Sequence, residues 1–191
     1  MDPARPIAPE LRHHPQMRIV AGTLGGRHLK APAGRATRPT SDRVREALFS
    51  ILGDLDGARV LDLFAGSGAL GIEALSRGAS AAVFVDTDPK ALTAIKANLQ
   101  ALDITAKVHR RDAIAYLNNA GEAPFDLVFL DPPYSSASEM AGPLSERLPS
   151  VLSEDARIVS ESDKRHPLIL TLPLLDERVY GDTRIAIHRV R

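Results

Sequence analysis

Residues 60–71 read VLDLFAGSGALG, an apolar run that passes into a glycine-rich turn and then into a second apolar segment. This pattern is typical of a β-strand, a tight turn and the first turns of a helix. Gly66 and Gly68 would let the backbone approach a ligand closely, and the start of the helix favours a negatively charged group such as a carboxylate. The stretch predicts an α/β fold with a ligand site at the end of this strand.

Two other interpretations of the glycine turn must be weighed. Gly66, Gly68 and Gly71 also fit the Gly-x-Gly-x-x-Gly spacing of nicotinamide dinucleotide sites. Asp62 lies four residues before the first glycine, where its carboxylate would repel a pyrophosphate and would suit the ammonium group of a methionine moiety. A tight turn that binds no ligand is the remaining alternative.

Strand and helix patterns alternate along the rest of the chain, which has the ordinary composition of one α/β domain. A terminal hairpin is indicated by Gly181-Asp182. Such units predict a mostly parallel sheet with an antiparallel last strand. This arrangement resembles that of the Rossmann-like class I methyltransferases, and the resemblance implies seven strands in the order 3-2-1-4-5-7-6. Strands are expected at 59–63, 81–86, 107–110, 126–131, 157–161, 177–180 and 184–189, and helices at 42–52, 69–77, 89–102, 113–118 and near 141–152.

The first forty residues differ from the remainder, so we expect three segments. Residues 1–16 contain four prolines and little apolar periodicity, which predicts a disordered extension. Its pair His13-His14 lacks further ligands at usable spacing, and we predict no metal site. Residues 17–40 are expected to form a small basic hairpin and loop, and residues 41–191 the main domain.

The formal net charge of zero hides an asymmetry that points to nucleic acid. Residues 17–45 hold seven basic side chains and one acidic one, whereas residues 46–191 hold 15 basic and 21 acidic ones. A basic N-terminal arm could bind phosphates, and the alternative is a solvated, mobile arm. The chain has no cysteine, which excludes disulfides and thiolate chemistry, and no apolar run that suits a membrane span or a signal peptide. We expect a cytoplasmic monomer.

Acidic residues follow the next two predicted strands. Asp86 is placed where a carboxylate can accept hydrogen bonds from both ribose hydroxyls. Asp88 competes for that role, but its position before Pro89 favours a helix N-cap. Asp112 could accept from an adenine amino group, or it could be another helix cap.

The most specific motif is Asp131-Pro132-Pro133-Tyr134, directly after the fourth strand. Two prolines fix the backbone and remove two N–H donors, so carbonyls and the carboxylate of Asp131 remain as acceptors. The exocyclic amino group of a base needs such a set, since Asp131 and the carbonyl of Pro132 can bind its hydrogens. Tyr134 offers a face on which an unstacked base can lie. The amino nitrogen can attack first and lose its proton afterwards, so no base catalyst is required.

With these motifs, the chain resembles the RsmD family of 16S ribosomal RNA guanine-N2 methyltransferases over residues 17–191. The resemblance rests on RIVAG at 18–22, GGR at 25–27, RPTSDRVRE at 38–46, the 62–71 turn and the 131–134 motif. It implies a methyl transfer from S-adenosylmethionine to a guanine, position 966 in the family, in 16S RNA of the small subunit or its precursor. The ribose position is commonly Glu in the family, and here it is Asp86.

The resemblance also implies roles for three groups of residues. Cofactor contacts are expected from Asp62, Phe64, Ala65, Gly66, Ser67, Gly68, Asp86, Asp112 and Ala113. The target guanine is expected at Asp131, Pro132, Pro133 and Tyr134, and the RNA at Arg18, Arg27, Lys30, Arg35, Arg38 and Arg43.

Three alternative functions are open. A DNA adenine-N6 methyltransferase shares the Asp131 motif but commonly carries a target-recognition domain for which this chain has no room. A protein glutamine methyltransferase usually has Asn as the first residue of the motif. An RNA assembly factor that binds the cofactor without catalysis is the third, and the intact motif argues against it.

Overall fold

The computed structural model describes residues 17–34, 41–121, 124–133 and 136–190. The predicted extension at 1–16, with its histidine pair, therefore lies outside the described residues, as do Arg35, Arg38 and Tyr134. None of the helices in the described ranges is long and apolar enough to cross a lipid bilayer.

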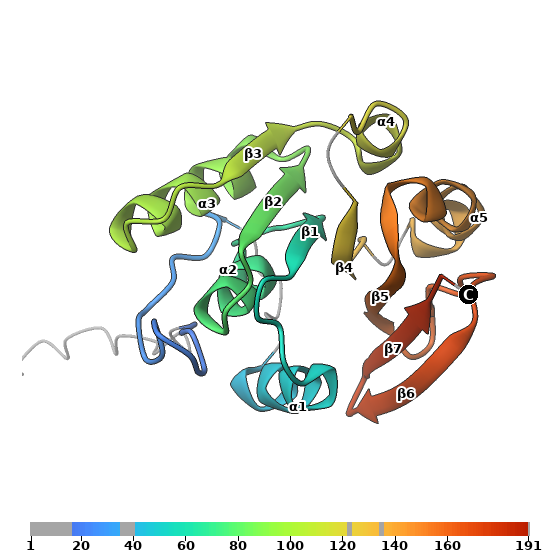
Figure 1. Ribbon diagram of the computed structural model, residues 1–191, viewed down its shortest axis with the longest axis horizontal. Coiled ribbons are helices and arrows are strands. Elements are labelled where there is room, and N and C mark those ends of the chain that lie inside the picture. The colour runs from blue at the N-terminus through green and yellow to red at the C-terminus, as the bar shows by residue number, and fades with distance from the viewer. Residues whose placement is uncertain (1–16, 35–40, 122–123, 134–135, 191) are drawn as a thin grey trace, which may run out of the picture.

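The described strands form one seven-stranded sheet in the order β3-β2-β1-β4-β5-β7-β6, which confirms the predicted topology (Figure 1). Neighbouring strands from β3 to β5 are parallel, and β7 is antiparallel to both β5 and β6. The strands are β1 (Arg59–Leu63), β2 (Ala81–Asp86), β3 (Lys107–Arg110), β4 (Phe125–Leu130), β5 (Leu152–Asp163), β6 (Leu174–Tyr180) and β7 (Thr183–Arg189).

Helices cover both faces of the sheet. The first three helices lie on one face and the last two on the other (Figure 1). Two of the helices begin at a polar N-cap residue whose side chain accepts a hydrogen bond from the first turn. The Ser41 hydroxyl accepts from the backbone N–H of Val44, and the Asp88 carboxylate accepts from that of Lys90. The helices are α1 (Asp42–Leu52), α2 (Ala69–Ser76), α3 (Pro89–Ala101), α4 (Ala113–Leu117) and α5 (Ala137–Arg147), which continues into the 3-10 turn η1 (Leu148–Val151).

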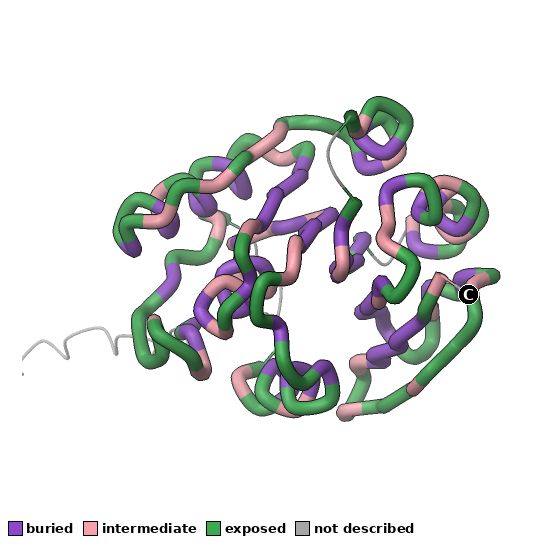
Figure 2. Tube along the Cα trace, viewed as in Figure 1, coloured by how far each residue is buried: buried purple, intermediate pink, exposed green. Residues whose placement is uncertain are grey.

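Each face of the sheet has its own apolar cluster, because side chains alternate along every strand. Phe84 and Phe129 belong to the cluster under α1, α2 and α3, and the Phe49 ring of α1 lies 5.7 Å from that of Phe129. Leu61 and Leu63 of β1 belong to the cluster under α4 and α5. Figure 2 shows the central strands buried except for one half-buried residue near the start of each. In parallel sheets of this kind, ligands bind beyond the carboxyl ends of the strands.

Several element boundaries were predicted wrongly. Strand β5 runs from Leu152 to Asp163, whereas 157–161 was expected, and its polar stretch 160–163 is buried and paired with β7. Strand β6 begins at Leu174, before the expected start at residue 177. Helix α5 begins at Ala137, earlier than the expected start near 141, and it contains Pro143. The helix accommodates this proline and continues to Arg147.

Residues 17–34 pack into the main core. They form a small hairpin-like turn with a single bridge between Arg18 and His28, and Ile19 is completely buried. The carboxylate of Glu73 in α2, also fully buried, accepts from the backbone N–H groups of Val20 at 2.7 Å and Ala21 at 3.0 Å. This segment is therefore part of the domain and does not extend from it as a separate arm.

Candidate active site

A cleft of about 770 Å³ opens beyond the carboxyl ends of the central strands. This volume lies within the usual range of cofactor sites. The cleft brings together the glycine turn after β1, the end of β2, the start of α4 and the motif after β4. Among the predicted site residues, it is lined by Asp62, Phe64, Ala65, Gly66, Ser67, Asp86, Asp112, Ala113, Asp131, Pro132 and Pro133.

Asp62 is a buried carboxyl group at the base of the cleft, with only 3% of its surface exposed. Its Oδ2 accepts a hydrogen bond of 3.0 Å from the backbone N–H of Gly71. Burial raises the pKa of Asp62 to about 8, and the charge of Asp86 acts in the same direction. A carboxylate held in this way favours a cationic partner, so the site fits the ammonium group of a methionine moiety.

The turn after β1 has the backbone that its glycines predict. Gly66 and Gly68 have φ values of 57° and 79°, a region that favours glycine. Phe64 adopts a similar φ of 69° without being a glycine, and such strained residues occur preferentially at ligand sites. A Cβ atom on Gly71 would lie 2.4 Å from the Phe84 ring, so this third glycine allows α2 to approach β2 closely.

Asp86 holds the glycine turn in place. Its Oδ2 accepts from the backbone N–H of Gly66 at 2.9 Å, and its Oδ1 accepts from that of Asp88 at 2.8 Å. The side chain is nearly buried at the edge of the cleft. Each carboxylate oxygen has a further lone pair, so the predicted ribose contact is compatible with these bonds.

Asp112 begins α4 and also lines the cleft. Its Oδ1 accepts from the backbone N–H of Ala115 at 3.0 Å, which is the helix cap considered above. Because Asp112 also lines the cleft, a contact with the adenine amino group is compatible with its position and stays a prediction. Asp88 caps α3 as expected.

The motif after β4 lies at the open side of the same cleft. Asp131 is exposed and Pro132 is buried. The carbonyl of Pro133 accepts from the backbone N–H and the hydroxyl of Ser136, at 2.9 and 3.0 Å. These bonds tie the motif to the start of α5, so the position of Asp131 is set by a strand on one side and a helix on the other.

Comparison with known proteins gives consistent matches over nearly the whole chain. The family described as "Conserved hypothetical protein 95" matches residues 17–189. The putative rRNA methyltransferase YlbH of Bacillus subtilis is 45% identical over 183 residues, covering 92% of this chain and 100% of that protein. The ribosomal RNA small subunit methyltransferase D of Haemophilus influenzae is 37% identical over 175 residues, covering 87% and 90%. The chain belongs to the RsmD family.

Solved structures agree with this assignment. The putative methyltransferase yhhF from Escherichia coli has a TM-score of 0.78 and 35% sequence identity, covering 92% of this chain and 98% of that one. The fold is that of a Rossmann-like class I methyltransferase.

Three charged residues of this RsmD-family chain line the cleft without having been predicted there: Arg45, Arg111 and Glu161. Arg45 is 1% exposed, and its Nη2 donates to the carbonyl of Arg18 and to Oδ1 of Asp42, both at 2.6 Å. We had counted Arg45 as part of a basic surface. Its spacing to Leu48, Phe49 and Leu52 places it on the buried face of α1, and this pattern could have indicated burial.

The basic residues predicted to contact RNA are exposed where the structure describes them. Arg18 pairs with Asp42 at 2.8 Å, Arg27 donates to the carbonyl of Ala101, and Arg43 is exposed. Their backbone is fixed, so they would present charge on a preformed surface.

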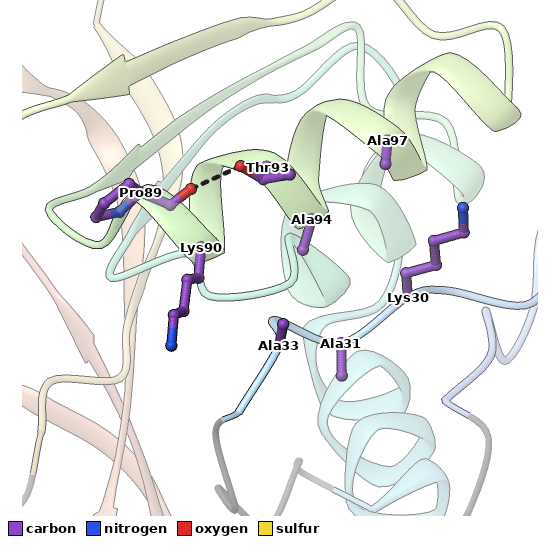
Figure 3. A pocket seen from close by; sticks show the side chains of 8 residues that line it. All are labelled: Lys30, Ala31, Ala33, Pro89, Lys90, Thr93, Ala94 and Ala97. Carbon is purple, nitrogen blue, oxygen red and sulfur yellow. Dashed lines mark hydrogen bonds between the residues drawn. The ribbon is translucent and has the colours of Figure 1, made fainter.

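Lys30 lies at a shallow groove of about 420 Å³ between residues 30–33 and α3. Figure 3 shows Lys30 and Lys90 at opposite ends of this groove, with alanine side chains between them. Asn98 of α3 fixes the segment, because its side chain accepts from the backbone N–H of Lys30 and donates to the Lys30 carbonyl.

Proposed function

We propose that this chain transfers a methyl group from S-adenosylmethionine to the exocyclic N2 of a guanine in 16S ribosomal RNA, within the small subunit or its precursor. The proposal rests on one observation: the buried carboxyl group of Asp62 and the motif that begins at Asp131 line the same cleft. Relatives that match most of the chain are named ribosomal RNA small subunit methyltransferase D, which supports ribosomal RNA as the substrate class.

The residues around the glycine turn fit the proposed cofactor. S-adenosylmethionine, when bound, supplies an electrophilic methyl group. Asp62 would hold its ammonium group, and the N-terminal end of α2 would favour its carboxylate. Asp86 would accept from the ribose hydroxyls and Asp112 from the adenine amino group.

The motif after β4 would bind the amino group that receives the methyl group. The carboxylate of Asp131 and the carbonyl of Pro132 would each accept one of its two hydrogens. These contacts favour a pyramidal nitrogen, whose lone pair is less delocalised into the ring. Asp131 also stabilises the positive charge that develops on this nitrogen, and the proton can leave to solvent because Asp131 is exposed. Catalysis then consists mainly of positioning and electrostatics.

A comparison of ribosomal RNA from cells with and without the protein tests this function. Mapping of modified nucleotides should show one N2-methylguanine in 16S RNA that disappears when the gene is deleted. Re-expression of the unaltered chain should restore the modification, whereas an Asp131→Ala variant should not. An unchanged set of 16S modifications, or the loss of an N6-methyladenine from DNA, would refute the proposal.

A further inference from the structure

A second carboxylate, Glu161, lies beside Asp131 in the cleft. Strands β4 and β5 are parallel, and Leu130 is paired with Ser160. Glu161 is the residue of β5 after Ser160, and Asp131 directly follows the end of β4, so both come just beyond a pair of strands that run about 4.8 Å apart. Both residues line the cleft.

Glu161 belongs to the face of the sheet that lies beneath α1. Phe129 and Val159 precede Asp131 and Glu161 by two residues each and lie in the cluster beneath α1. Because side chains return to the same face every second residue of a strand, Glu161 is directed to that face as well, and Asp131, one residue beyond β4, lines the same cleft. The cleft therefore holds two hydrogen-bond acceptors side by side.

A buried positive charge accompanies them. Helix α1 runs antiparallel to β4 and β5, since Arg157, which is paired with Leu127 of β4, donates to the carbonyl of Leu52, and the ring of Phe49 contacts that of Phe129 farther along β4. Arg45, one turn before Phe49, therefore lies toward the carboxyl ends of these strands, where it lines the cleft. Its Nε and Nη1 have no hydrogen-bond partner among the residues that the structure describes.

Glu161 has only 6% of its surface exposed, and a carboxylate buried to this extent is costly unless positive charge lies nearby. Arg45 supplies such a charge at the same end of the sheet. In its carboxylate form, Glu161 can accept hydrogen bonds but cannot donate them.

We propose that Glu161 is a specificity-determining residue that accepts a hydrogen bond from N1–H of the target guanine while Asp131 holds the adjacent amino group. The proposal rests on the function proposed above. In guanine, the ring nitrogen beside the exocyclic amino group carries a hydrogen. In adenine and cytosine, the corresponding ring nitrogen has a lone pair, which would face the carboxylate of Glu161 without a hydrogen bond. The pair of acceptors thus selects guanine by its Watson–Crick edge.

A base analogue separates this role from a structural one. In 2-aminopurine, the 2-amino group that receives the methyl remains, but N1 becomes an acceptor. We would measure kcat/KM of the full chain on 16S RNA with guanine or 2-aminopurine at the mapped target. The unaltered protein should prefer guanine by at least about 100-fold, because a site built for an N–H donor rejects an analogue that lacks it.

The variant Glu161→Gln should reduce this preference by about 10-fold or more, since an amide can donate to N1 of 2-aminopurine as well as accept from guanine. A loss of stability alone would lower both rates together and leave their ratio unchanged. Glu154→Gln is the matched control, because Glu154 is an exposed residue at the other end of β5, and it should retain the original ratio.

Equal use of guanine and 2-aminopurine by the unaltered protein would overturn the inference, and this comparison requires no variant to fold. An unchanged ratio in a folded Glu161→Gln protein would also overturn it. Neither result affects the proposed function, provided that guanine N2 is methylated. A failure to methylate guanine N2 at all would instead refute the proposed function and the inference with it.

Discussion

Asp62→Asn is expected to separate cofactor binding from folding. The amide oxygen of Asn can still accept from the backbone N–H of Gly71, which now binds Oδ2 of Asp62 at 3.0 Å. The negative charge facing the cleft is lost. A charge-assisted hydrogen bond contributes about 1.5–3 kcal/mol, so the Kd for S-adenosylmethionine should rise by about 10-fold to 150-fold. Isothermal titration calorimetry measures this directly.

The raised pKa of Asp62 predicts a second measurable difference between this variant and the unaltered protein, the release of a proton on cofactor binding. At pH 6.5, a carboxyl group with a pKa of about 8 is mostly protonated, whereas an α-amino group is still mostly an ammonium ion. Binding of the ammonium should therefore expel nearly one proton from the unaltered protein. Titrations in buffers with different ionisation enthalpies would detect this proton, and Asp62→Asn should release none.

Stability should respond to pH with a defined sign. The pKa of Asp62 lies at about 8 in the folded chain and near 3.8 in the unfolded one. The stabilisation from the bound proton is complete below about pH 3.8 and is lost as the pH rises through 8. Without its ligand, Asp62→Asn should thus be at least as stable as the unaltered protein at pH 8. Unchanged cofactor affinity together with no proton release would refute the role assigned to Asp62.

Two further predictions concern packing and charge. Gly71→Ala should lower the free energy of unfolding by about 1–3 kcal/mol and weaken cofactor binding, because its Cβ would lie 2.4 Å from the Phe84 ring and 3.2 Å from Oδ2 of Asp62. Denaturant unfolding and calorimetry would test this, and a variant as stable as the original would contradict the close packing. Lys30→Glu combined with Arg43→Glu should weaken RNA binding and flatten its dependence on salt, while cofactor affinity stays the same. Identical salt slopes would exclude these two side chains from the RNA interface.

Strand and helix positions near the glycine turn were predictable because local signals agree there. Strands β1, β2 and β3 have the predicted bounds, since each is a short run closed by a turn or by an Asp residue that caps a helix. The motif at Asp131 was found for a related reason, because its prolines and carboxylate are unusual directly after an apolar strand.

Buried charges were the principal source of error. Arg45 was counted with the basic residues of the N-terminal segment, and Glu161 was noted only as the end of an expected strand, yet both are buried at the cleft. Residues 17–34 were interpreted as a basic arm because of their basic side chains. Their docking depends on Glu73, a carboxylate within an apolar helix, which accepts from Arg77 and from two backbone N–H groups of this segment. No residue pattern reveals the backbone partners. Contacts between residues this far apart in the sequence depend on the three-dimensional fold and could not be predicted from local residue patterns.

Single-turnover methyl transfer by the Asp131→Ala variant tests the central claim most directly. The assay uses 16S RNA or small subunits and saturating S-adenosylmethionine, with N2-methylguanine as the measured product. Asp131 is exposed, so the variant should fold and bind the cofactor normally. The account predicts that its rate falls by at least about 100-fold, as when one preorganised electrostatic contact is removed, and that Asp131→Asn lies between the two. Transfer by Asp131→Ala at nearly the original rate would contradict the account.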